Sequence, residues 1–272
     1  MRRSGWLTAN AALVFVFLYL PIATLVVLSF NASGLPTSWG GFSTEWYGEL
    51  VRSAAIRRAF GNTLLVATAA TAVATVLGTL LAVGIERFTR GALMESVSFV
   101  PLIIPDIVMG IAALSAFSLA GVSLGLGTVT IAHITFGIAF VAAIVRTRLR
   151  GFDRSLEEAS RDLGAGAFET FVRVTLPVIM PGVVAGALVA FTLSLDEFVI
   201  AFFTVGLQTT FPIQVYSMFR FGVTPEINAA ATLLVGVSLT VVLLAVRFVG
   251  PQRDAGARRG RTDGRSGAKG SR

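Results

Sequence analysis

The sequence predicts an all-α membrane protein with six membrane-spanning helices and both termini in the cytoplasm. Composition is the first observation, because 54% of the 272 residues are hydrophobic and only 14% are charged, whereas soluble domains carry about 25% charged residues. The second observation is a set of long uncharged runs, and the third is an uneven distribution of basic residues. These features exclude a soluble protein, in agreement with a mean hydropathy of +0.80.

Six apolar segments are long enough to cross a bilayer, since about 20 helical residues span a hydrocarbon core of about 30 Å. Three of them contain no Asp, Glu, Lys or Arg, namely 9–30, 62–85 and 126–145. Two others contain acidic residues and one ends against an arginine, namely 98–120, 178–203 and 228–246. The first segment exceeds the roughly 7–15 residues of a signal-peptide core, so we expect it to be retained as a span.

The basic residues predict the orientation. With six spans and cytoplasmic termini, 18 of the 22 Lys and Arg residues lie in segments assigned to the inside and four lie outside, as the positive-inside rule requires. We therefore expect a multi-pass protein of the cell inner membrane. The basic tail 251–272 is expected to be disordered beside anionic lipid, and not to bind nucleic acid.

The connection after the first span predicts an interfacial helix. Within 42–60, apolar residues recur at helical spacing, and they are Trp46, Tyr47, Leu50, Val51 and Ala54. We divide the chain into the first span with this outer segment (1–58), the main transmembrane domain (59–250) and the tail (251–272). Small residues in "TAATAVATVLG" and "GVVAGALVA" favour a closely packed bundle in the main domain.

The connection before the fifth span is unusually polar. Ser155 and Glu158 have the spacing of a capping box, and Gly164 stands where a glycine ends a helix. Phe168, Phe171 and Val172 then repeat at helical spacing, and Pro177 closes the segment. The pattern predicts two short amphipathic helices at about 153–176, on the cytoplasmic side. Neither is long enough to be stable alone, so their apolar faces need a cover, either the bundle or a soluble partner.

This connection resembles the EAA loop of type I ABC importer permeases, whose pattern is E-A-A-x3-G-x9-I-x-L-P. The matching residues are Glu158, Ala159, Ser160, Gly164, Leu176 and Pro177, with Ser160 in place of alanine and Val174 in place of isoleucine. The resemblance implies the type I ABC importer transmembrane fold, with the loop as a coupling helix in a groove of the ATP-hydrolysing subunit. There, Glu158 would make a polar contact and Gly164 would supply the bend.

The resemblance also implies the partners. These are a homologous permease subunit, two ATP-binding subunits that hold ATP and magnesium, an extracytoplasmic solute-binding protein and membrane lipid. The chain itself would bind no cofactor or metal and would not be an enzyme. A P-loop needs a lysine to reach the phosphates, and the only lysine is Lys269 in the tail.

Three carboxylates interrupt the apolar spans, namely Asp106, Asp196 and Glu197. Because charge is costly at membrane depth, such residues usually face a cavity and mark a substrate path. A cavity with several carboxylates attracts polycations, and nearby rings add cation–π contacts; the candidates are Phe191, Phe198, Phe202 and Tyr216. The structural alternatives are that Asp106 caps a helix restarting after Pro105, or that an acidic residue pairs with an arginine of another subunit.

Four stretches narrow the expected class of substrate, because they resemble the second permease of spermidine/putrescine importers. They are "IPDIVMGIAAL", "HITFGIAFV", "FTLSLDEFVIAFF" and "FPIQVYSMFRFGVTPEINAAATLL". The family's acidic pair is often Asp-Asp, whereas here it is Asp196-Glu197. The resemblance implies polyamine import driven by ATP, with another solute of an ABC importer as the alternative.

Two other classes compete with this interpretation. A proton-coupled secondary transporter would use Asp106, His133 and Asp196, with His133 as a proton relay. The simpler role for a lone histidine is a hydrogen bond between helices. A membrane enzyme is the third class, and neither a metal cluster nor a nucleophile–His–acid set in the sequence supports it.

Overall fold

The computed structural model describes residues 5–35, 38–88, 96–220 and 224–249. Within these ranges the chain is almost entirely helical, and the only β-type pairing is an isolated bridge between Asn31 and Phe42. The elements are α1 (Gly5–Leu28), α2 (Glu45–Arg52), α3 (Ala54–Phe88), a 3₁₀ turn (Val100–Leu102), α5 (Asp106–Leu119), α6 (Leu126–Arg150), α7 (Ser155–Asp162), α8 (Ala167–Thr170), a π-helical turn (Phe171–Thr175), α9 (Leu176–Asp196), α10 (Val199–Thr204), α11 (Phe211–Phe219) and α12 (Pro225–Val249). The basic tail lies outside the described residues.

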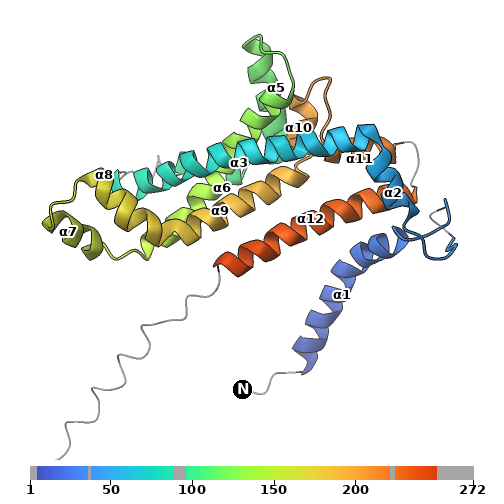
Figure 1. Cartoon of the computed structure of the whole chain (residues 1–272), viewed down its shortest axis with the longest axis horizontal. Helices are drawn as coiled ribbons and strands as arrows, with labels where there is room; N and C mark the ends of the chain where they lie inside the picture. The colour runs from blue at the N-terminus through green and yellow to red at the C-terminus, as the bar shows by residue number, and fades with distance from the viewer. Residues whose placement is uncertain (1–4, 36–37, 89–95, 221–223, 250–272) are drawn as a thin grey trace, which may run out of the picture.

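Helices α3, α6 and α9 form the centre of the bundle and lie side by side (Figure 1). Glycines allow their close approach. A Cβ atom on Gly78 of α3 would lie 2.7 Å from the Cβ of Val141 on α6, and one on Gly186 of α9 would lie 3.2 Å from the Cα of Val141. Val141 is therefore enclosed between two glycine positions on neighbouring helices, and small residues permit this packing, as their abundance in the second and fifth spans predicted.

Among the residues that the structure describes, five helical segments have the length and composition of membrane spans: Gly5–Leu28, Ala54–Phe88, Leu126–Arg150, Ala167–Asp196 and Pro225–Leu244. The expected span at 98–120 is different. Pro101 and Pro105 divide it into a 3₁₀ turn and α5, which has 14 residues and is about 21 Å long. A helix of that length is too short to cross the bilayer alone, so the expectation of six full spans is not met in this part of the chain.

The first helix, α1, is exposed along its length and has no buried residue. Its side chains are apolar on every face, which suits a helix surrounded by lipid. It extends away from the rest of the bundle and contacts α12 (Figure 1).

The interfacial segment is shorter than predicted. Helix α2 ends at Arg52 because Ser53 is extended, at φ −64° and ψ 113°, and residues 54–60 begin α3. Leu50 is buried among Phe211 and Ala229, with Trp46 and Tyr47 against the same cluster. Val51 and Ala54 are exposed, whereas Ile56 and Phe60 of α3 return to the same cluster.

The bundle has two ends with different elements. Figure 1 shows α7 and α8 at one end, which we call the α7 end, and α2 and α11 at the other, which we call the α2 end. The connections that the sequence assigned to opposite sides of the membrane are therefore separated by the length of the bundle. Which end faces the cytoplasm remains a prediction from the charges.

Candidate functional site

Helix α7 is followed by a sharp bend at Gly164. The glycine has φ +89°, the left-handed region that disfavours side chains with a Cβ. Its N–H donates to the carbonyl of Arg161 at 2.8 Å, and the N–H of Ala165 donates to the carbonyl of Ser160 at 3.1 Å. These two bonds form a Schellman motif, which satisfies the last carbonyls of α7 and reverses the chain.

The start of α7 differs from the predicted capping box. The first helical residue is Ser155, and its N–H donates to the Asp153 carboxylate at 3.0 Å. Hydrogen bonds from the Ser155 side chain and backbone lower the pKa of Asp153. Asp153 therefore supplies the carboxylate at this helix start, two residues earlier than the pattern indicated, and it satisfies the N–H of the first helical residue.

The second predicted short helix is the beginning of a long one. Residues Ala167–Asp196 run as one helical segment, so Pro177 does not close it. The π-helical turn Phe171–Thr175 precedes the proline, and the N–H of Leu176 donates to the carbonyl of Phe171. Proline lacks an N–H and crowds the preceding turn, and the wider π turn accommodates this without breaking the helix.

The corner formed by α7, Gly164 and α8 presents apolar side chains outward. Leu163 is 90% exposed, Phe168 is 81% exposed, and Leu156 is about half exposed. Glu158 and Ala159 are exposed on the same helix, whereas Ser160 is half-buried and its hydroxyl lies 3.1 Å from that of Thr170. Leu176 is half-buried and Pro177 is exposed on the following segment. Large apolar groups so exposed at the end of a bundle are typical of a contact surface for another protein.

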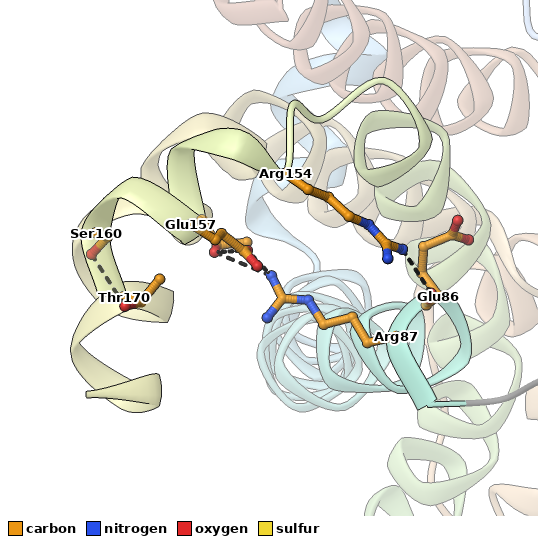
Figure 2. Close-up of polar contacts among 7 residues, drawn as sticks. Glu86, Arg87, Arg154, Glu157, Ser160 and Thr170 are labelled. Atoms are coloured by element: carbon orange, nitrogen blue, oxygen red, sulfur yellow. Dashed lines mark hydrogen bonds and ion pairs between the residues drawn. The ribbon is translucent and has the colours of Figure 1, made fainter. Parts of the chain in front are cut away.

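Glu157, which the sequence analysis did not single out, is the buried acid of this corner. Its carboxylate accepts hydrogen bonds from Arg87 of α3 and from Thr175 of the π turn, and Figure 2 shows the side chains of Glu157 and Arg87 directed at each other. Arg154 also donates to the backbone carbonyl of Glu86 at 3.4 Å. The only local signal was a second glutamate beside Glu158, because its partner Arg87 lies 70 residues away.

A second set of predicted residues gathers around the break between α9 and α10. Asp196 is the last residue of α9, and Glu197 follows in the break. Glu197 Oε1 accepts the N–H of Ile200 at 2.8 Å, so this side chain caps α10. Asp106 begins α5, which packs against α10 through Gly110.

Three of the four aromatic candidates cluster at this site. The ring of Phe198 lies 4.8 Å from that of Tyr216 and 5.5 Å from that of Phe202, measured between centroids. Tyr216 comes from α11, so the cluster bridges α10 and α11. Phe191 lies on α9 and makes none of these ring contacts. The structure thus places three carboxylates and three rings in neighbouring segments, which is the chemistry expected for an organic cation.

His133 joins two helices of the bundle. It is buried on α6, and its Nδ1 lies 2.7 Å from the hydroxyl of Ser194 on α9. Its ring packs near that of Phe136. This is the simpler role considered for the lone histidine, a hydrogen bond between helices.

The chain is similar to known transport proteins. The family model described as "Binding-protein-dependent transport system inner membrane component" matches residues 74–254. The putrescine transport system permease protein PotI of Escherichia coli strain K12 is 45% identical over 244 residues, covering 86% of this chain and 87% of that protein. The spermidine/putrescine transport system permease protein PotC of the same strain is 40% identical, covering 89% and 91%.

Solved structures share the fold at low identity. A bacterial ABC transporter involved in the import of the acidic polysaccharide alginate has a chain that aligns with a TM-score of 0.68 at 16% identity, covering 90% of this chain and 95% of that one. The MetNI methionine ABC transporter in an inward-facing conformation aligns with a TM-score of 0.60 at 21% identity, covering 76% and 98%.

Proposed function

The chain belongs to the family of binding-protein-dependent transport system inner membrane components, and from this premise we propose that it is the permease subunit of an ATP-driven polyamine importer. As a member of that family it is a multi-pass inner-membrane protein and is not itself an enzyme. The putrescine and spermidine/putrescine permeases align with it over most of their length. Their substrates are flexible polycations, which suit the carboxylates and rings around the α9–α10 break.

We further propose that the complete transporter contains a homologous permease, two ATP-binding subunits and an extracytoplasmic solute-binding protein. ATP and magnesium would be bound by the ATP-binding subunits. A solved relative of this fold was crystallised in complex with an alginate-bound periplasmic protein, which supports a solute receptor as a partner of this architecture.

The observation that carries this function is the exposed apolar corner at the α7 end. Its residues Glu158, Ala159, Ser160 and Gly164 would form the contact with the ATPase, with Leu176 and Pro177 at the start of the long helix behind it. Leu163 and Phe168 would fill the groove of the ATPase, since the described residues leave both side chains exposed. When the ATPases close on ATP, they would press on this corner and switch the bundle between inward- and outward-facing states.

The substrate path would run past Asp106, Asp196 and Glu197, with Phe198 and Tyr216 supplying aromatic faces. A protonated amine over a ring gains about 0.5–2 kcal/mol, more when water is excluded. Several such contacts in series, combined with fixed negative charge, would bind a chain of amines spaced by methylene groups while repelling anions.

Association with the ATPase tests the function. We expect Leu163→Glu and Phe168→Glu to abolish co-purification of the ATP-binding subunit and uptake, because each would place a charge in an apolar contact. Insertion into the membrane should persist, since both side chains are solvent-exposed. The matched control is Leu207→Glu, an equally exposed leucine in the connection between α10 and α11. Unchanged co-purification in both corner variants would contradict the assignment.

A further inference from the structure

We propose that Arg87 is a positioning residue, which clamps Glu157 so that α7 moves as one body with α3 and α9. We call the three side chains of Arg87, Glu157 and Thr175 the tether. The inference rests on the proposed function, because it concerns how the corner formed by α7, Gly164 and α8 transmits motion to the bundle. We call this corner the coupling corner. No residue of the EAA pattern takes part in the tether.

The tether joins three separate elements. Glu157 lies on α7, Arg87 lies in the last turn of α3, and Thr175 ends the π turn that leads into α9. The Glu157 carboxylate accepts from both partners, and Arg87 Nη2 also lies 3.2 Å from the Thr175 hydroxyl. Each side chain therefore contacts the other two, so that a displacement of one is resisted by both of the others. Figure 2 shows the contact between Arg87 and Glu157.

Burial makes this contact stronger than an ordinary surface ion pair. The side chain of Glu157 is 11% exposed and that of Arg87 is 22% exposed, so both charges have lost much of their water. Separating them would leave two largely buried charges without a partner, which is unfavourable. By contrast, the pair of Arg173 and Glu169 is well exposed and lies within one stretch of helix, where such pairs contribute little.

The other attachments of α7 are weaker. Arg154 reaches the Glu86 carbonyl at 3.4 Å, and the hydroxyls of Ser160 and Thr170 lie 3.1 Å apart. Helix α7 has eight residues, which is too short for stability in isolation. Among the described residues, Leu163 is 90% exposed and Leu156 is about half exposed, so neither is buried against the bundle. The tether is thus the buried, charged attachment through which a push on α7 reaches the transmembrane helices.

Helix α3 carries the displacement to the α2 end. It has 35 residues, a length of about 52 Å. Near its start, Asn62 Nδ2 donates to the Thr209 carbonyl at 2.9 Å, and the Thr63 hydroxyl accepts the N–H of Phe211 at 2.7 Å. These bonds hold the connection between α10 and α11, which lies beside the aromatic cluster. One continuous helix therefore links the coupling corner with the segments of the candidate substrate path.

The test uses the assembled transporter in lipid nanodiscs and proteoliposomes, with putrescine uptake and ATP hydrolysis measured on the same preparation. We expect Arg87→Gln and Glu157→Gln to lower the putrescine transported per ATP hydrolysed by at least about fivefold, the lower range of allosteric coupling. Subunit assembly and ATP hydrolysis should persist. Exchanging the charges, with Arg87→Glu and Glu157→Arg together, should restore the ratio. The control Arg173→Gln removes the exposed pair and should change nothing.

A second experiment follows from the absence of cysteine in the chain. In the variant with Arg87→Cys and Glu157→Cys, a short bifunctional thiol reagent would replace the tether by a covalent bridge. We expect the bridged transporter to recover the ratio of putrescine transported to ATP hydrolysed that the unbridged variant has lost, because the bridge again makes α7 and α3 move together. A bridge that instead stops transport would overturn the inference, since α7 must then move relative to α3.

The outcomes separate the inference from the proposed function. If the parental transporter assembles and takes up putrescine but Arg87→Gln keeps its full transport ratio, the tether is not needed for coupling and the inference is wrong. If the parental chain does not assemble with an ATP-binding subunit, the proposed function itself is wrong. If Arg87→Gln fails to insert into the membrane, two other variants decide whether the tether is needed for coupling. They are Thr175→Val and the bridged cysteine variant, and the measurement is again the putrescine transported per ATP hydrolysed.

Discussion

At the scale of single residues, Gly164 determines whether the coupling corner can form. Its φ of +89° is the constraint, because a Cβ there would meet no atom within 4 Å. We expect Gly164→Ala to cost about 1–2 kcal/mol, which lowers the population of the native corner by about 5- to 30-fold. The measurement is uptake together with co-purification of the ATP-binding subunit.

Gly166 provides the matched control for this variant. It lies two residues later at φ −70°, and a Cβ there would also meet open space. Gly166→Ala should therefore preserve both uptake and co-purification. Equal loss in the two variants would show that the bend at Gly164 is not the reason for the effect.

The Glu197 side chain has two roles, since it carries a negative charge and also caps the start of α10. Different substitutions separate these roles. Glu197→Gln keeps an oxygen that accepts the Ile200 N–H but removes the charge, so we expect a raised KM for putrescine and normal insertion. Glu197→Ala removes the cap as well, at a further cost of about 0.5–2 kcal/mol in stability. Uptake kinetics and thermal unfolding in detergent measure the two effects. An unchanged KM in both Glu197→Gln and Asp196→Asn would contradict a substrate path at this break.

The residue scale also shows where sequence reasoning was limited. The EAA pattern pointed to Glu158, and the structure places Glu158 on the exposed surface and its neighbour Glu157 in the interior. Both have the same local context in the first turn of α7. Only the position of Arg87, at the far end of another helix, distinguishes them.

At the scale of elements, the contact between α3 and α6 depends on the absence of a side chain at Gly78. A Cβ there would lie 2.7 Å from Val141 Cβ and 2.8 Å from the backbone oxygen of Ile138, and a helix backbone does not yield cheaply. We expect Gly78→Ala to destabilise the bundle by about 1–3 kcal/mol through overpacking. The midpoint of thermal unfolding in detergent measures this.

Gly84 lies in the same helix, and an alanine there is expected to have the opposite effect on stability. A Cβ at Gly84 would meet nothing within 4 Å, and alanine is favoured over glycine in a helix by about 1 kcal/mol. Gly84→Ala should therefore be neutral or stabilising. A larger loss of stability in Gly84→Ala than in Gly78→Ala would refute the glycine-mediated contact.

Prolines account for the two places where the helix boundaries expected from the sequence differ from those in the structure. Pro101 and Pro105 interrupt the expected third span and leave α5 short, whereas Pro177 and Pro181 lie within the long segment Ala167–Asp196. Proline removes a donor in every case. Whether the helix continues depends on the turn around it, and the π turn before Pro177 is a feature that hydrophobic periodicity does not encode.

At the scale of the whole molecule, the source of energy distinguishes the proposed importer from a proton-coupled transporter. In proteoliposomes with the complete transporter, we expect a protonophore to leave putrescine uptake unchanged, because no proton is coupled to the cycle. Replacing ATP by a non-hydrolysable analogue should reduce uptake to background. Uptake that follows the proton gradient would instead favour the path through Asp106, His133 and Asp196.

The sequence by itself determined the class of the protein, most of its spans and the position of the polar loop that resembles the EAA loop. These depend on local properties, namely the length of apolar runs, the bias of basic residues and the spacing of a short pattern. The tertiary structure decided that Glu157 pairs with Arg87, that the helix beginning at Asp106 packs against α10, and that Phe198 meets Tyr216. Burial and pairing depend on partners far along the chain, and only the packing of the helices brings those partners together.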